Sequence, residues 1–354
     1  MKIRFSAVLM LGALALTSLL PAAVFAQDLN FEYFRDEVQP IFLAKRDGNL
    51  RCIQCHTSSS SFRLQALEGE ALFWTDEQSR MNYESASTMV LAGEHPLQSR
   101  LLTHPLAASA GGDAFHGGGK HFPDQDDPEW RIMAGWVAGA DSREPISNVV
   151  PRIIQTNAAG EGATIIDPET NKVVGTITDI EKPHGITSAP DGSQLYISNE
   201  VMHSLDIVDS RTLRVKRRIP LSGRPNNVSV TGDGSKVYVA IMQRPGALDV
   251  IDTKTMKNIK TVPVDGAIHN VYVTPDSRYA VGGSIQTSTI NVVDTATDEL
   301  VWKLKMSSGI RPMIFDSKPD GSTKNIYVQL SGFHGFAVVD FDKREEVARI
   351  EHPP

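Results

Sequence analysis

The chain has only two cysteines, and both lie beside a histidine in the run Cys52-Ile53-Gln54-Cys55-His56. In a Cys-x-x-Cys-His run the two thiols are spaced to form thioethers with the two vinyl groups of one haem. The adjacent imidazole then falls under the iron as the proximal ligand. The motif therefore predicts one covalent haem c, attached through Cys52 and Cys55 and ligated by His56.

Two other kinds of site use the same residue types. A thioredoxin-like redox pair requires a βαβ context, and half of a zinc site requires a second cysteine or histidine pair at fixed spacing. The residues before the motif instead repeat at helical spacing, as Phe31, Phe34, Val38, Ile41 and Phe42. This context favours the haem interpretation.

A second stretch with helical spacing places Trp130, Met133, Trp136 and Val137 on one face. In order and length, residues 31–140 resemble the class I cytochromes c, in which two helices pack across the haem. The resemblance implies a small all-α cytochrome c domain, which we expect over residues 27–141.

The same resemblance directs attention to the loop before the last helix, where the family usually carries a methionine ligand. Here that loop contains His116, Gly117, Gly118 and Gly119. We expect His116 to be the distal iron ligand, with His104, His121 and Met133 as alternatives and a vacant sixth position as a further possibility. A bis-histidine iron would pass electrons, whereas an open iron could bind a small molecule.

The first 26 residues have the order of a secretory signal. Lys2 and Arg4 precede an apolar run over 5–20, and small residues end at Ala26. We expect cleavage after Ala26 and a periplasmic or otherwise exported protein, the alternative being a retained membrane anchor. No later segment is long and apolar enough to span a membrane.

The charged residues are scattered along the chain. Loss of the two leader cations changes the formal net charge from −7 to −9. This balance argues against nucleic acid or an anionic membrane as the partner.

After a linker expected over 142–151, short β-branched runs alternate with turns that recur at a regular period. Asp191, Asp233, Asp276 and Asp320 are 42, 43 and 44 residues apart. A second series of aspartates has spacings of 42, 43, 42 and 46 residues, at Asp167, Asp209, Asp252, Asp294 and Asp340. Turn chemistry explains these aspartates, because a carboxylate accepts hydrogen bonds from the backbone amides that follow it.

A period in the forties with short strands is typical of β-propeller blades. The runs Pro190-Asp191-Gly192 and Leu195-Tyr196-Ile197-Ser198-Asn199 resemble the YVTN family of propeller repeats. The resemblance implies an all-β propeller over 152–354, with a generic β-sandwich as the alternative. About four to five blades are present, so we expect either part of a longer ring or an unusual five-bladed ring.

The first strand of each blade normally lines the channel of a propeller, so its polar residues are candidates for binding. The clearest are His184, Asn226, His269 and Arg311. Together they could hold an anion or a metal, or they could line a solvated channel mouth.

These features favour a periplasmic haem protein that transfers electrons and whose propeller docks a redox partner protein or a small electron donor or acceptor. An oxidoreductase with a catalytic site in the propeller channel is the first alternative, on the architecture of dihaem nitrite reductases. A haem-based sensor or binding scaffold is the second.

Overall fold

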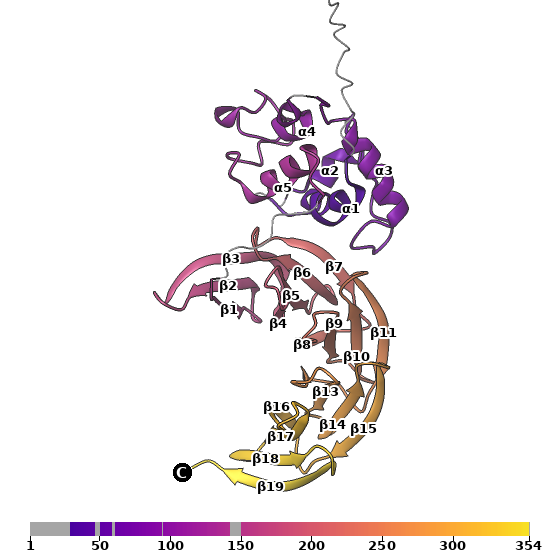
Figure 1. Cartoon of the computed structure of the whole chain (residues 1–354), viewed down its shortest axis with the longest axis vertical. Coiled ribbons are helices and arrows are strands. Elements are labelled where there is room, and N and C mark those ends of the chain that lie inside the picture. Colours follow the sequence, from indigo (N-terminus) through magenta and orange to yellow (C-terminus); the bar gives the residue numbers. More distant parts are fainter. Residues whose placement is uncertain (1–28, 47–49, 59–60, 94, 142–149, 354) are drawn as a thin grey trace, which may run out of the picture.

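The structure, a computed structural model, describes residues 29–46, 50–58, 61–93, 95–141 and 150–353. The predicted secretory signal and most of the predicted linker lie outside these ranges. Within the described residues the helices all precede residue 138 and the strands all follow residue 152. Figure 1 shows the helical part above an arc of β-sheets.

The helical part contains short helices joined by long loops. Their bounds are α1 Phe31–Tyr33, η1 Phe34–Val38, η2 Gln39–Phe42, α2 Cys52–His56, α3 Asp76–Ser87, η4 Pro96–Gln98, α4 Arg100–Thr103, η5 Ala108–Ala110 and α5 Pro128–Val137. One apolar cluster forms the core of this part and includes Phe34, Leu102, Met133 and Trp136, all at most 1% exposed.

The predicted first helix is present, but its hydrogen bonding changes along its length. The chain continues from α1 through a π-helical stretch, η1, into the 3-10 turn η2, which has Pro40 near its start. Proline has no backbone N–H to donate, so it disfavours a regular α-helix at this point. The apolar side chains nevertheless face the core, since Phe34, Val38 and Phe42 are buried.

The predicted last helix is α5. It begins with Pro128 in its first turn, and the Asp127 carboxylate accepts hydrogen bonds from the backbone N–H groups of Glu129 and Trp130 at 2.8 and 3.2 Å. These are typical signals of a helix start. Trp130 and Trp136 are buried, as the apolar spacing predicts.

The β part consists of five antiparallel sheets, one of three strands and four of four strands. The strands are β1 Ile153–Thr156, β2 Glu161–Asp167, β3 Lys172–Glu181, β4 Pro183–Ser188, β5 Gln194–Asn199, β6 Ser204–Asp209, β7 Val215–Pro220, β8 Pro225–Val230, β9 Lys236–Ile241, β10 Ala247–Asp252, β11 Lys257–Pro263, β12 Asn270–Val273, β13 Tyr279–Ser284, β14 Thr289–Asp294, β15 Glu299–Lys305, β16 Ile310–Ser317, β17 Thr323–Leu330, β18 Gly335–Asp340 and β19 Glu345–Glu351.

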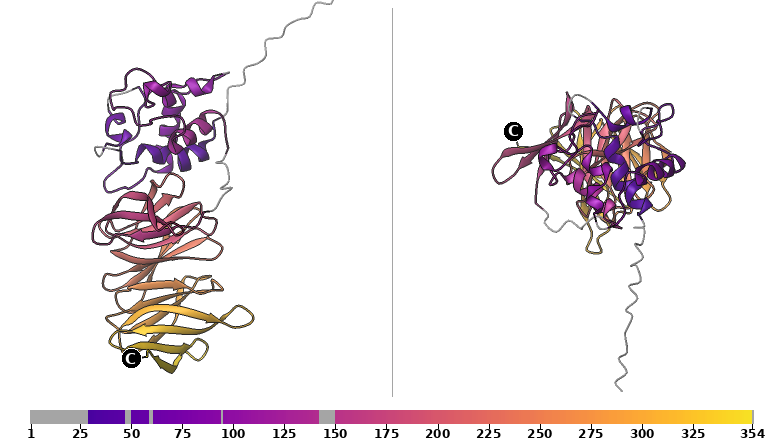
Figure 2. Two further views of the ribbon diagram at one scale, coloured as in Figure 1. Left: turned by 90° about the vertical axis from the view of Figure 1, so that its left-hand side faces the viewer. Right: turned by 90° about the horizontal axis from the view of Figure 1, so that it is seen from above.

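The sheets stand side by side like the blades of a propeller, but they form an open arc and not a closed ring (Figures 1 and 2). The inner strands β4, β8, β12 and β16 lie next to one another in turn, and the outer strands β3, β7, β11 and β15 do the same. The three-stranded sheet lacks the innermost strand, because β1 pairs with β2 in the way that β5 pairs with β6.

The recurring aspartates make the turn contacts that their positions predict. At Asp191, Asp233, Asp276 and Asp320, the backbone N–H two residues further on donates to the carboxylate at 2.9–3.2 Å. The aspartates of the second series accept from backbone N–H groups two or three residues further on. These side chains therefore stabilise the turns between strands.

The helical part rests on the outer strands β3 and β7. Lys216 of β7 forms an ion pair with Glu37 at 2.7 Å, and the guanidinium of Arg217 lies 3.9 Å from the ring centre of Phe73. Lys216 and Arg217 are neighbours on one strand, so a single outer strand contacts two segments of the helical part.

A second contact involves the residue just before the Cys-x-x-Cys-His run. Arg51 forms an ion pair with Asp179 of β3 at 2.9 Å, and Asp179 also pairs with Arg218 of β7 at 3.0 Å. Arg218 in turn reaches the fully buried Asp206 at 3.3 Å. The helix α2 is thus linked through ion pairs to the interior of the second sheet.

Candidate functional site

The helix α2 carries both cysteines and His56 at the edge of a cavity in the helical part. Its start is fixed by the Gln54 side chain, whose Oε1 accepts from the backbone N–H of Arg51 at 2.8 Å. One turn of helix places Cys52 and His56 on the same side of the helix axis. Both cysteines and His56 line the cavity.

This cavity, hereafter the histidine cavity, has a volume of about 440 Å³. Its walls are mostly apolar, and its polar groups are the cysteines and histidines together with Ser61 and Arg100. The lining includes Ile41, Phe42, Cys52, Cys55, His56, Phe62, Met89, Leu101, His104, His116, Gly117, Gly118, His121, Phe122 and Met133. Such a lining suits a large apolar group that carries a metal ion.

All four residues predicted as candidate distal ligands line the histidine cavity: His104, His116, His121 and Met133. The ring centre of His116 lies 6.2 Å from that of His56, and the planes of the two rings differ by 32°. The rings of His104 and His121 lie 5.1 and 5.8 Å from that of His116. The structure therefore brings the alternatives together and places His116 beside the predicted proximal residue.

The hydrogen bonds of His56 and His116 determine which ring nitrogen is available to a metal. Nδ1 of His56 lies 2.8 Å from the carbonyl oxygen of Phe62, and Nδ1 of His116 lies 2.6 Å from that of Gly119. A carbonyl oxygen only accepts, so each Nδ1 must carry the proton and each Nε2 keeps its lone pair. Burial lowers the pKa of His116, which favours its neutral form.

His104 is oriented in the same way by a different group. Its Nδ1 bonds to the Asp113 carboxylate, and this hydrogen bond lowers the pKa of Asp113. Lys120 donates to the backbone carbonyl of His104 at 2.8 Å. Nε2 of His104 is therefore also a possible ligand atom.

A buried ion pair lies next to Cys52. Arg46 and Glu129 are paired, each with a side chain 6% exposed, and the Arg46 guanidinium packs over the ring of Phe122 at 5.3 Å. Burial raises the pKa of the Cys52 thiol, and the positive charge of Arg46 opposes that increase. The pair holds the chain segments at 46 and 129 against each other beside the cysteine.

Sequence reasoning did not identify several of these contributors. The carbonyl of Phe62 and the ion pair of Arg46 with Glu129 carry no local sequence signal. Glycine at 117 and 118 was noted, and both residues line the histidine cavity.

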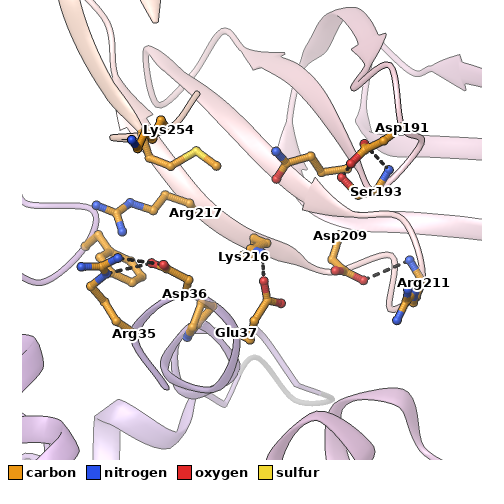
Figure 3. Close-up of a pocket in the computed structure, with 14 residues that line it drawn as sticks. Arg35, Asp36, Glu37, Asp191, Ser193, Asp209, Arg211, Lys216, Arg217 and Lys254 are labelled. Atoms are coloured by element: carbon orange, nitrogen blue, oxygen red, sulfur yellow. Dashed lines mark hydrogen bonds and ion pairs between the residues drawn. The ribbon is translucent and has the colours of Figure 1, made fainter. Parts of the chain in front are cut away.

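A larger cavity, of about 560 Å³, lies where the helical part meets the strands (Figure 3). Arg35 pairs with its neighbour Asp36 on the helical side, and Lys216 of β7 pairs with Glu37 of the helical part. Burial lowers the pKa of Arg217, which packs on Phe73 at one edge. These contacts are those of an interface between two parts of one chain. The smaller histidine cavity has the chemistry of a cofactor site.

Of the four polar residues expected to line the inner strands, two lie close together. His184 and His269 come together, with ring centres 6.1 Å apart, and burial lowers the pKa of His184. Asn226 is buried, at 1% exposure, and its Nδ2 donates to the Met242 sulfur. Arg311 of β16 donates to Ser331, in the turn after β17.

No metal site is apparent on the inner strands. Across the ranges that the structure describes, no group of three or more His, Cys, Asp or Glu side chains is arranged to hold a metal ion.

None of the helices in the described ranges has the length and apolar character of a membrane span.

No protein-family model and no curated protein matches the chain. Among solved structures, the chain is similar to hydrazine synthase from Kuenenia stuttgartiensis, at 22% identity with a TM-score of 0.49, over 59% of this chain and 68% of that one. It is also similar to dihydro-heme d1 dehydrogenase NirN in complex with DHE, at 17% identity and a TM-score of 0.47. That match covers 72% of this chain and 59% of the other, so the chain spans about three fifths of that protein's length.

Proposed function

We propose that the helical part binds one haem covalently through Cys52 and Cys55, and that His56 and His116 are its axial ligands. The supporting observation is the histidine cavity, which two cysteines and four histidines line, His56 and His116 among them. We further propose that the protein transfers electrons and that it does so outside the cytoplasm, where c-type haem is attached in bacteria.

The spacing of the two imidazoles fits this proposal. A ring nitrogen lies roughly 1 Å from the ring centre and binds a metal at roughly 2 Å, so two imidazoles on opposite sides of one metal have ring centres roughly 6 Å apart. The observed separation between His56 and His116 is 6.2 Å. This separation supports His116 as the distal ligand.

The hydrogen bonds that His56 and His116 make through Nδ1 also support a role as metal ligands. Metal-binding histidines usually donate their other ring N–H to a carbonyl or carboxylate, which fixes the ring and its tautomer. His56 and His116 both do so, towards Phe62 and Gly119. Both rings are thus oriented through Nδ1 by a backbone carbonyl oxygen.

A haem with two histidine ligands supplies one-electron transfer and offers no open position to a substrate. The residues of the cavity support that chemistry by excluding water. Phe42, Leu101, Phe122 and Met133 are all buried and apolar. A bound group would therefore change charge in an environment that needs little solvent rearrangement.

In this proposal the β part holds the helical part and offers other surfaces to a partner. Its outer strands β3 and β7 hold the helical part, which leaves the inner strands and the end sheets for other partners. We propose that the partner is a redox protein or a small electron donor or acceptor.

The proposal is tested by the visible spectrum of the exported protein, oxidised and reduced, with and without carbon monoxide. A six-coordinate haem gives a low-spin spectrum that the gas does not change. His116→Ala should produce a high-spin fraction that binds carbon monoxide, because it opens one axial position. A low-spin spectrum that survives His116→Ala unchanged would contradict the assignment of His116.

Matched controls come from the same cavity. His121→Ala and His104→Ala remove neighbouring imidazoles and should leave the low-spin spectrum in place, and Met133→Leu keeps the volume while removing the sulfur. Cys52→Ser with Cys55→Ser should abolish covalent haem altogether. Protein without haem in the parent chain would contradict the whole proposal.

A second candidate function is an oxidoreductase with a catalytic site on the inner strands. The contact between His184 and His269 favours it, because two partly buried imidazoles from separate sheets meet there. The test is the metal content of the parent and of the His184→Ala/His269→Ala variant after purification from metal-supplemented medium. Equal non-haem metal in both proteins would remove a metal centre from this alternative.

A further inference from the structure

The cavity between the helical part and the strands, hereafter the junction cavity, is lined by more basic than acidic side chains. The basic residues are Arg35, Arg211, Lys216, Arg217 and Lys254, and the acidic residues are Asp36, Glu37, Asp191 and Asp209. They come from η1, from β7 and from the turns that join strands. The charge that the cavity offers to another molecule depends on which of these groups already have partners.

The carboxylates of the junction cavity are all engaged within the protein. Both oxygens of Asp36 accept from the Arg35 guanidinium at 2.8 Å, and Glu37 pairs with Lys216 at 2.7 Å. The two turn aspartates in the lining accept from the backbone N–H groups that follow them, as described above. These acids therefore have little capacity left for the remaining cations.

Arg217 is a partly buried cation that has no acceptor. Its guanidinium packs over the ring of Phe73 at 3.9 Å, and its side chain makes no hydrogen bond or ion pair in the part of the chain that the structure describes. Burial lowers the pKa of Arg217, while the charge of Asp36 opposes this effect and that of Arg35 adds to it. Arginine carries five N–H donors, and burying them without an acceptor costs free energy. A bound anion would offset this cost.

Lys254 adds a second cation at the same edge of the junction cavity. It lies in the turn between β10 and β11 and is exposed, and among the described residues its side chain has no hydrogen bond or ion pair. Figure 3 shows Lys254, Arg217 and Arg35 along one edge of the cavity. Asp36 is the carboxylate beside them, and Arg35 occupies both of its oxygens. This edge therefore carries an excess of positive charge.

We propose that the junction cavity binds a small organic anion through Arg217 and Lys254. The planar guanidinium matches the geometry of a carboxylate or a phosphate group, and the lysine adds a second positive charge. The volume of about 560 Å³ is in the range that holds a small organic molecule, and Pro40, Phe73 and Met256 give its lining apolar surface. The formal net charge of the chain is −7, so the attraction comes from these local cations and not from the whole molecule.

The proposal is independent of the haem assignment, and isothermal titration calorimetry of the full chain at low ionic strength tests it. Inorganic phosphate, pyrophosphate and citrate serve as separate probes. The parent should bind at least one of them saturably, and the tighter probe shows whether the site prefers phosphate or carboxylate groups. Arg217→Gln and Lys254→Gln should each weaken binding by about tenfold or more, because each removes a charged donor. Lys257→Gln changes an exposed lysine beside the same turn that does not line the cavity, and it should bind like the parent.

A third variant tests the sign of the charge effect. Asp36→Asn should tighten binding, because it removes a carboxylate from the cationic edge and releases Arg35. Circular dichroism of each variant checks its fold, and the exposed Lys254 decides the result if Arg217→Gln does not fold. A parent chain that binds none of the three probes saturably would overturn the proposal. Parental binding by both Arg217→Gln and Lys254→Gln would also overturn it, because the anion would then bind elsewhere.

Discussion

His56 shows how a single backbone group can orient an imidazole. The carbonyl of Phe62 lies six residues further along the chain and fixes the proton on Nδ1. His116 is oriented in the same way by Gly119, three residues away. In both cases a nearby residue supplies the acceptor, so the imidazole and its orienting group form one local unit.

The turn aspartates lead to a prediction about acid stability. Hydrogen bonds from the Thr231 hydroxyl and from Ser235 lower the pKa of Asp233 from 3.8 to about 2. In the unfolded chain the carboxyl regains its ordinary pKa, so the unfolded state binds more protons between about pH 4 and pH 2. The stabilisation is therefore present above about pH 4 and is lost as the pH falls through about 2.

Asp233→Asn should then lower the urea midpoint at pH 6 and make little difference at about pH 2. Urea unfolding followed by circular dichroism at several pH values measures both effects. Asp265→Asn removes a carboxylate that lies outside these turns and serves as the control. A midpoint difference that stays the same across this pH range would contradict the role given to the turn hydrogen bonds.

At the scale of elements, the position of α2 depends on the strands as well as on the helical part. Arg51, just before α2, forms its ion pair with Asp179 of β3, which also pairs with Arg218. The side chains of Arg51 and Asp179 are 27% and 15% exposed, so the pair is partly shielded from solvent. Such a pair contributes more than an exposed one, and it leaves a charge uncompensated when one member is removed.

We expect Asp179→Asn to loosen the helical part from the strands. Asparagine tolerates the positive φ of 66° at this position, so the substitution removes charge with little change in backbone preference. Small-angle scattering should show a larger radius of gyration than the parent, and most clearly at low salt. Asp265→Asn is again the control. An unchanged scattering profile would show that the other contacts, such as Lys216 with Glu37, are sufficient.

The elements differ in how far the sequence predicts them. The sheets were predictable because each one is a local unit whose turns and strands recur with a fixed period. The helix α2 was predictable from its Cys-x-x-Cys-His motif, and α5 from its apolar spacing. The contact between the two parts was not predictable, since Lys216 and Glu37 are 179 residues apart and neither belongs to a pattern. The choice among His104, His116 and His121 also depends on the path of a glycine-rich loop, which spacing alone does not determine.

Across the whole molecule, the apolar core is divided. One cluster lies in the helical part, and separate clusters fill the spaces between successive sheets. Cores that share few side chains can unfold independently, in which case one free energy of unfolding does not describe the chain. We therefore expect two calorimetric transitions, one for each part.

Substitution within each core should shift its own transition. Trp136 is fully buried, and its Nε1 donates to the backbone carbonyl of Asn30 at 2.9 Å. Trp136→Ala should cost about 3–5 kcal/mol and lower the midpoint of the helical transition. Ile251→Ala, at a fully buried position between two sheets, should cost about 2–5 kcal/mol and lower the other midpoint.

Differential scanning calorimetry of the two variants and the parent distinguishes the alternatives. A single transition that both substitutions lower equally would mean that the ion pairs of β3 and β7 couple the two parts into one cooperative unit. Two transitions, with one substitution lowering the midpoint of each, would mean that the helical part and the sheets unfold independently. The ion pairs would then orient the helical part but not couple its unfolding to that of the sheets. The contacts between the parts are mostly charged side chains, whereas each core is apolar, and this difference favours the second outcome.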